Sequence, residues 1–285
     1  MKKTILLTTA LAVFTIAKGQ SGHEISANID VGSSALKYSI SNSGDIRSQI
    51  GSSFGVGYTY KFNSEWGIVS GIEWTNYKSE ISFLKLNDRY MTQDNYRNDF
   101  EWRLTLNDLK EKLEGTYLNI PLLVQITPNR INKLYANIGF TIGIPLSGKY
   151  KSNYTNLVAS GYYPETDAEY TDIDFRGFGK FEGKKSQGDI DFDIAFMLSA
   201  ECGMKWNLSN SINLYTGGYV NYGLNNILKE NGHYNIISYD ELHPTNFQYN
   251  GLLFSKYTHE SITKPFVDKI VPLSFGLKVK LGFSI

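Results

Sequence analysis

The chain has 285 residues, including 28 Lys or Arg, 28 Asp or Glu and a single Cys. A formal net charge of zero gives no electrostatic reason to bind nucleic acid or an anionic surface. The lone thiol, Cys202, excludes an internal disulfide and a Cys-based zinc site, and 26 glycines with 14% aromatic residues favour a β protein.

The first 19 residues have the pattern of a secretory signal. Lys2 and Lys3 precede an apolar stretch, and Ala17-x-Gly19 has the small residues of a cleavage site. We therefore expect a signal peptide over residues 1–19 and a mature domain over 20–285. Cleavage would remove three lysines and leave a net charge of about −3. Beyond this segment, no apolar run reaches the roughly 18 to 20 residues of a membrane helix.

Period-two alternation then recurs along the chain, with apolar residues at every second position. Such runs predict strands that are apolar on one face. None of the roughly 50 positions on this face is charged, although a composition of 20% charged residues would place about ten charges there. Exclusion of charge is expected where a face meets lipid, since a charge at mid-bilayer costs roughly 2 to 4 kcal/mol. The eight runs are 25–31, 54–62, 66–74, 118–126, 134–146, 190–206, 212–224 and 271–285.

The opposite face holds most of the strand glycines and nine charged residues. Glycine suits the concave inside of a narrow barrel, so we expect this face to point inward. Buried charges must be paired, and five acids with four bases allow pairing. The predicted lumen ion-pair network is Asp30, Lys61, Glu73, Asp191, Asp193, Glu201, Lys205, Lys278 and Lys280.

The connections between runs alternate between short and long. Turns of a few residues follow the second, fourth and sixth runs, whereas long loops are expected over 32–49, 80–115, 150–188 and 225–268. This pattern predicts an eight-stranded antiparallel up-and-down transmembrane β-barrel with long extracellular loops, in which the last strand pairs with the first. The predicted location is the bacterial outer membrane, with both termini periplasmic and Trp66, Trp74 and Trp206 in the interfacial girdles. The first run changes parity near residues 32–36, which predicts a bulge there.

Three segments resemble the PorT-type family of outer-membrane β-barrel proteins. They are "YLNIPLLVQI" (117–126), "IGFTIGIPLSGKY" (138–150) and "YVNYGLNNI" (219–227). The resemblance implies a barrel fold and brings no catalytic residues. Most members of this family have no assigned activity, and its namesake is an accessory of type IX protein secretion in Gram-negative bacteria. The final "LGFSI" resembles the strand signal that the barrel-assembly machinery reads, which makes that machinery an expected partner.

Smaller patterns outside the runs suggest sites that each have a simpler explanation. His259, Glu260 and Ser261 offer a base and a nucleophile for a lipid-modifying enzyme, but a polar loop explains them as well. Clustered acids in the third loop offer calcium ligands, although a solvated acidic loop explains them too. His233, His243 and His259 lack metal-ligand spacing, so no metal site is assigned. The acids are Glu165, Asp167, Glu169, Asp172 and Asp174.

Two further patterns concern the long loops. Leu106, Leu109 and Leu113 have helical spacing, with Asn107 as a cap and Gly115 as a stop, which predicts a short amphipathic helix in the second loop. Tyr residues over 150–170 offer either a binding surface or ordinary loop packing.

The sequence as a whole favours a non-enzymatic envelope protein whose external loops contact other macromolecules. Outer-membrane lipid, the assembly machinery and other envelope proteins are the expected partners, and no cofactor, metal or nucleic acid is expected. The alternatives are a narrow porin-like channel for ions or small solutes and a lipid-modifying outer-membrane enzyme.

Overall fold

A computed structural model describes residues 22–40, 44–128, 133–229, 232–259 and 262–285. The expected signal peptide lies outside these residues. Most of the described residues are in β-strands, and there is one 3-10 turn among them, η2 (Asp174–Arg176). Within the described ranges, no helix is long and apolar enough to cross a membrane.

Each of the eight predicted runs lies wholly or mostly within one strand. The strands that contain them are β1 (His23–Ile40), β3 (Ile50–Lys61), β4 (Trp66–Gln93), β5 (Asp99–Ile126), β6 (Leu134–Asn153), β11 (Ala195–Asn207), β12 (Ile212–Gly223) and β18 (Val267–Ser284). The other strands are β2 (Asp45–Ser48), β7 (Asn156–Tyr163), β8 (Ala168–Tyr170), β9 (Gly179–Glu182), β10 (Lys185–Asp189), β13 (Tyr234–Asn235), β14 (Ile237–Ser238), β15 (Gln248–Tyr249), β16 (Ser255–His259) and β17 (Ile262–Pro265).

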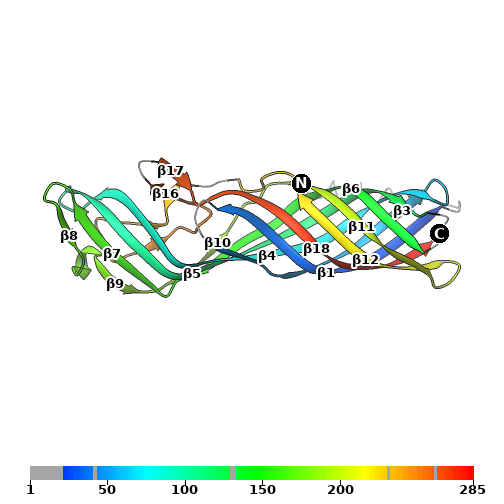
Figure 1. Ribbon diagram of the computed structural model, residues 1–285, viewed down its shortest axis with the longest axis horizontal. Helices are drawn as coiled ribbons and strands as arrows, with labels where there is room; N and C mark the ends of the chain where they lie inside the picture. The colour runs from blue at the N-terminus through cyan, green and yellow to red at the C-terminus, as the bar shows by residue number, and fades with distance from the viewer. Residues whose placement is uncertain (1–21, 41–43, 129–132, 230–231, 260–261) are drawn as a thin grey trace, which may run out of the picture.

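Antiparallel pairing runs through these eight strands as a circuit. β1 pairs with β3, and the pairing continues through β4, β5, β6, β11, β12 and β18, which pairs with β1 again. Glu24 lies opposite Ser284, so the described ends of the chain meet at one end of the molecule. Figure 1 shows this end opposite the end that carries β7, β8 and β9.

The two faces of the circuit are oriented as the alternation predicts. Leu277 on β18 exposes 72% of its surface, whereas the next residue, Lys278, exposes only 4%. Ile29, Phe54 and Phe140 are likewise exposed on the outside of their strands. The apolar face therefore points outward, and the charged, glycine-rich face points into the interior.

Inward-facing glycines allow neighbouring strands to curve tightly. Gly203 lies opposite Gly217 across the β11–β12 pair, and Gly57 lies opposite Gly71 across β3–β4. A Cβ atom on Gly217 would lie 2.2 Å from the carbonyl oxygen of Cys202, well inside van der Waals contact. The inner face at these positions therefore has no room for a side chain.

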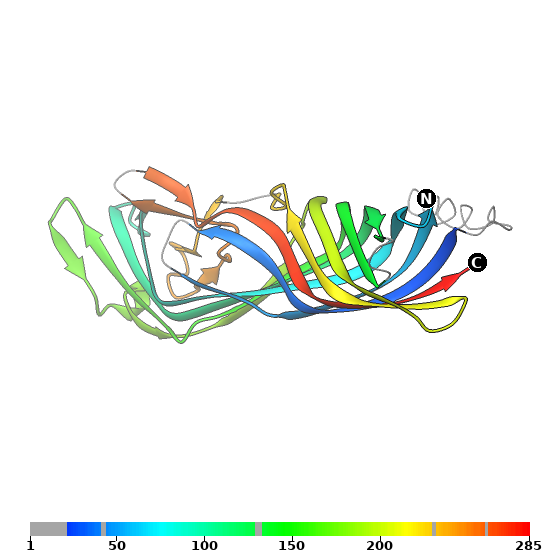
Figure 2. The same cartoon turned by 45° about the vertical axis from the view of Figure 1, so that its right-hand side comes forward.

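Strands β4 and β5 extend far beyond the other six strands of the circuit. Each has 28 residues, whereas a membrane crossing needs roughly 9 to 11. They stay paired from Trp66 opposite Ile126 to Gln93 opposite Asp99. The expected loop over 80–115 is therefore wrong: most of it is strand in a long ribbon, which β7, β8 and β9 extend sideways (Figure 2). We call the distal ends of β4 and β5, together with β7, β8 and β9, the outer extension.

The predicted helix at Leu106 to Leu113 is also wrong, because these residues belong to β5. Leu106 and Leu109 are both fully buried, although a regular strand would place them on opposite faces. Between them, Asp108 has a left-handed φ of 52°, which rotates the chain and returns the next leucine to the same side. A kinked strand thus reproduces the three-residue spacing of a helix.

The inside of the molecule changes from polar to apolar along its axis. One apolar cluster above the charged interior includes Leu36, Tyr38, Leu113 and Val267, and a second, larger cluster fills the outer extension around Trp102. The parity change expected near residues 32–36 is therefore not a bulge. Leu36 and Tyr38 still point inward, into an apolar core, and the register shift of β1 lies later, between Ser39 and Ile40.

The fourth long connection, between β12 and β18, is folded against the ribbon by polar contacts. Glu111 on β5 is buried and accepts hydrogen bonds from the Tyr249 hydroxyl at 3.0 Å and from the Leu252 N–H at 3.1 Å. Burial raises the pKa of this carboxyl group to about 7. On β4, the Tyr90 hydroxyl donates to the carbonyl of Ile237 at 2.9 Å. The described residues of this connection therefore pack onto the outer extension.

Adjacent glycines on β12 provide a matched test of this architecture. Gly217→Ala is expected to lower the free energy of unfolding by about 1 to 3 kcal/mol, because its methyl group meets a backbone carbonyl that cannot move aside. Gly218→Ala is the control, since its Cβ points outward and has 3.6 Å to its nearest neighbour. Urea unfolding in lipid vesicles measures both variants. Equal stability of the two would contradict the inward placement of Gly217.

Candidate functional site in the charged interior

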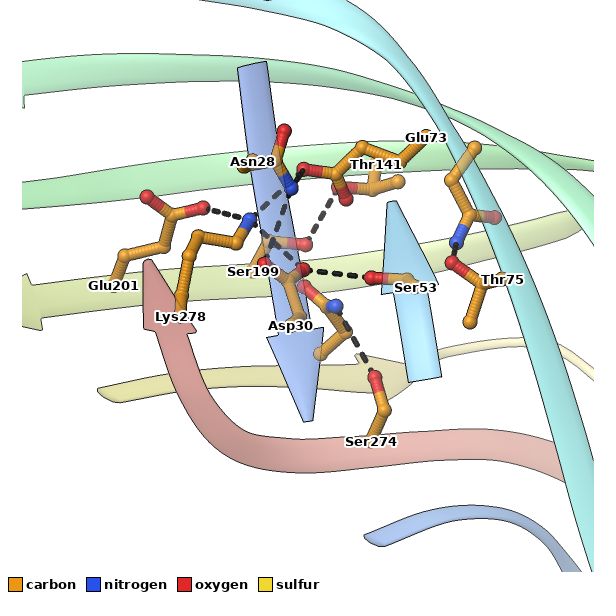
Figure 3. Close-up of polar contacts among 12 residues, drawn as sticks. Asn28, Asp30, Ser53, Glu73, Thr75, Thr141, Ser199, Glu201, Ser274 and Lys278 are labelled. Carbon is orange, nitrogen blue, oxygen red and sulfur yellow. Dashed lines mark hydrogen bonds and ion pairs between the residues drawn. The ribbon is translucent and has the colours of Figure 1, made fainter. Parts of the chain in front are cut away.

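Lys278 on β18 is the centre of the interior charge network. Its ammonium lies 2.6 Å from Glu201 Oε1, 2.8 Å from Glu73 Oε1 and 3.3 Å from Asp30 Oδ2. These carboxylates come from β11, β4 and β1, so one lysine joins four strands of the circuit (Figure 3). Period-two alternation puts all four side chains on the inner face, and the strand register brings them to one level.

Neutral side chains share the negative charge that remains around Lys278. Asn28 donates to Asp30 Oδ1 at 3.1 Å and to Glu73 Oε1 at 3.2 Å. The Ser53 hydroxyl donates to Asp30 Oδ2 at 2.7 Å, and Asn137 donates to Glu201 Oε2 at 2.6 Å. Each carboxylate therefore has a neutral donor besides the lysine, as burial of an ionised group requires. Figure 3 shows the donors of Asp30 and Glu73.

A second cluster lies nearer the end where the chain termini meet. Glu24 is fully buried and receives Lys61 at 3.2 Å, the Tyr215 hydroxyl at 2.8 Å and the Asn213 amide at 2.8 Å. Lys280 places its ammonium 4.5 Å from the centre of the Tyr215 ring, an arrangement that stabilises a cation. This cluster joins β1, β3, β12 and β18.

Lys205 lies on the same inner face as this cluster. It is half-buried on β11, and its ammonium is 5.8 Å from the centre of the Tyr215 ring. The sequence prediction named Lys61, Lys205 and Lys280 but missed Glu24. Alternation with Ile25 indicates the inward position of Glu24, but the predicted run begins one residue later, at Ile25.

Two predicted network members, Asp191 and Asp193, are not in the interior. Both are exposed and precede β11, which begins at Ala195. Phe192 is buried, so the predicted parity of this run is wrong at its start. The chain here packs its aromatic residue into the apolar cluster above the charged interior, and the two carboxylates turn outward.

With these corrections, the charges of the described interior balance. Four acids, Glu24, Asp30, Glu73 and Glu201, face four bases. The bases are Lys61, Lys205, Lys278 and Lys280. Equal numbers of each sign let the groups neutralise one another in a region that excludes most water.

A small cavity lies among these side chains. A cavity of about 20 Å³ adjoins Asn28, Glu73, Glu201 and Lys278, which is room for about one water molecule. Above the network, the rings of Tyr77 and Tyr117 meet edge to face at 5.7 Å. The interior is thus filled by ion pairs at one level and by apolar side chains at the next.

The other sequence candidates do not form a common site. Glu169 pairs with Arg103 at 3.2 Å, and Asp167 accepts the Tyr162 hydroxyl at 2.8 Å. His243 contacts Asp240 at 3.2 Å. Glu260 and Ser261 lie outside the described residues. Within the described part of the chain, no group of three or more His, Cys, Asp or Glu side chains is arranged to hold a metal ion.

Replacement of Lys278 tests the network directly. Lys278→Met is expected to destabilise the protein by about 3 to 5 kcal/mol, because three buried carboxylates lose their shared cation. The heat needed to convert the folded to the unfolded band on SDS gels measures the effect. Lys180→Met, on exposed β9, is the control.

A compensated variant separates charge from packing. If Asp30→Asn, Glu73→Gln and Glu201→Gln are added, Lys278→Met should recover much of the lost stability. No recovery would mean that the loss comes from packing of the lysine chain rather than from unpaired charge.

The known proteins that resemble this chain are distant from it in sequence. No curated protein sequence matches the chain significantly. Among solved structures, Ail of Yersinia pestis is similar at 10% identity, with 93% of this chain and 100% of that chain covered and a TM-score of 0.31. Neisserial surface protein A is similar at 10% identity, 94% and 100% coverage and a TM-score of 0.33. The protease OmpT of Escherichia coli is similar at 10% identity, 95% and 100% coverage and a TM-score of 0.30.

The family model described as "Outer membrane protein beta-barrel domain" matches residues 18–229, which is more than half of the chain. Its description agrees with an all-β chain whose apolar face points outward. The chain therefore belongs to the outer membrane protein beta-barrel domain family and is a protein of the bacterial outer membrane.

Proposed function

We propose that the chain is a closed, eight-stranded transmembrane barrel that does not conduct and acts through its outer extension, without enzymatic activity, by contact with other macromolecules. The main support for this proposal is that side chains occupy the interior of the circuit at two successive levels. Lys278 and its three carboxylates occupy one level, and the apolar cluster around Leu36 and Leu113 occupies the next. A solute would have to displace both layers.

The outer extension supports the contact role. It has its own apolar core around Trp102, so it is a folded unit rather than a set of loose loops. Large apolar side chains remain exposed on it and on the connection that packs onto it, including Leu84 at 84% and Leu242 at 74%. Exposed apolar residues that cluster on one region mark interaction surfaces.

Two further parts of the proposal are the orientation of the chain in the membrane and its role in protein secretion. A signal peptide over residues 1–19 would deliver the chain across the inner membrane, and assembly with both termini in the periplasm would direct the outer extension away from the cell. The resemblance to the PorT-type family gives this contact role a specific form, an accessory of type IX protein secretion.

Planar-bilayer recordings test the closed interior. The purified protein is expected to show no discrete conductance steps, because ion pairs and apolar side chains block the path. An open porin recorded in the same bilayer system is the control for insertion and detection. Stable unitary steps that persist across independent preparations would instead support the narrow-channel function.

Gene deletion tests the secretion role separately. In a bacterium that carries this chain, deletion is expected to abolish export of type IX substrates into the medium, measured by proteomics of the culture supernatant. Complementation with the intact gene is the control. Unchanged export would refute the secretion role and leave the closed barrel untouched.

A further inference from the structure

A cavity of about 500 Å³ lies at the far end of the outer extension. Its lining comes from the turn between β4 and β5, from the β7–β8 hairpin and from the segment around η2, and β7 and β8 lie at the end of the molecule remote from the C-terminus (Figure 1). This volume falls in the range of small-ligand pockets. None of the lumen residues takes part in it.

Asp94 connects the segments that line the cavity. This residue is only 2% exposed and accepts hydrogen bonds from the N–H groups of Tyr96 at 2.9 Å and Asn98 at 3.0 Å. It also accepts the Tyr163 hydroxyl at 3.1 Å and Arg176 Nη1 at 3.2 Å. Asp94 therefore joins all three wall segments, and the pocket is formed before any ligand arrives.

Aromatic rings line the opening. Phe175 is 76% exposed and Tyr170 is 42% exposed, although both border the cavity. Tyr170 meets Tyr163 edge to face at 5.6 Å, which fixes the direction of its ring. Large exposed rings beside a preformed hollow offer flat apolar surfaces on which a ligand can stack.

The charges on the lining disfavour an anionic ligand. Arg176 is the only cation of the lining, and Asp94 neutralises it at 3.2 Å, while Glu165 adds a negative charge. Arg176 donates from Nη1 to Asp94 and to the Tyr163 hydroxyl, and its guanidinium carbon lies 5.4 Å from the centre of the Tyr96 ring. A guanidinium carries five N–H donors, more than these two hydrogen bonds use. Asn98 and Thr166 supply further polar groups.

A ligand that combines an apolar flat face with many neutral hydroxyl groups fits this lining. We propose that the pocket binds a neutral saccharide unit outside the cell, which stacks on Phe175 and Tyr170 and bonds to Arg176, Asn98 and Thr166. The inference rests on the proposed outward direction of the outer extension and names the chemistry of its partner.

Glycan-array binding by the detergent-solubilised full-length protein tests the inference. Neutral oligosaccharides are expected to bind, and affinities for the best of them are then measured by titration calorimetry. Phe175→Ala and Tyr170→Ala should each weaken binding about tenfold, the loss of one stacking face. Tyr234→Ala is the matched control, since Tyr234 is also exposed, at 57%, but lies outside the pocket.

Several results would overturn the inference. These are the absence of any neutral glycan among the ligands, binding of sulfated or sialylated glycans alone, capture of peptides instead of glycans, and equal affinity of Phe175→Ala and the control. A separate measurement checks the direction of the extension: Phe175→Cys in a Cys202→Ser background should react with an impermeant maleimide on intact cells. Labelling without glycan binding refutes only the saccharide site, whereas absence of labelling refutes the proposed orientation.

Discussion

Pairing of each strand with two neighbours around the circuit is the constraint on which the rest of this structure depends. In a bilayer no water is available to satisfy a free strand edge, so each strand must have two paired neighbours. The pairing of β18 with β1 meets this requirement for the last and first strands of the circuit. Curvature follows from the same requirement, and it places glycine opposite glycine at Gly203 and Gly217, where a side chain would meet a carbonyl.

The circuit in turn determines what can lie inside it. The outer face is apolar, so the polar and charged residues of the strands collect in a narrow interior where they must neutralise one another. Lys278 satisfies three carboxylates from three other strands, and Glu24 gathers Lys61, Asn213 and Tyr215. These contacts tie together strands that are distant in sequence, and the cavity beside Lys278 has room for about one water molecule.

In the outer extension a different environment acts on the strands, and the interior is apolar rather than charged. The ribbon of β4 and β5 no longer needs an apolar outside, and it buries Leu106, Leu109 and Trp102 as a soluble domain would. Buried polar groups connect the segments of the outer extension. Glu111 accepts hydrogen bonds from the connection between β12 and β18, and Asp94 accepts hydrogen bonds from the segments around the distal pocket. The outer extension is thus held together by its own apolar core and by buried polar groups.

Much of the circuit is determined by local sequence. Alternation has a period of two in any strand, so the eight runs, the inward position of Lys278 and the outward position of Leu277 follow from residue order alone. That information ends where the environment changes. The segment 80–115 also alternates, with Phe100, Trp102, Leu104 and Leu106 buried, but its parity changes at Asp108, where a left-handed φ gives two parts of one strand the spacing of a helix.

Tertiary structure alone decided the partners. Sequence placed Asp30, Glu73 and Glu201 on the inner face but could not say that they share one lysine, because strand register joins residues more than 70 positions apart. It also could not turn Asp191 and Asp193 outward, since burial of Phe192 in a distant cluster sets their direction. Periodicity is a local property and contact is not, so the sequence determined the faces of the strands, and only the folded chain determined which side chains meet.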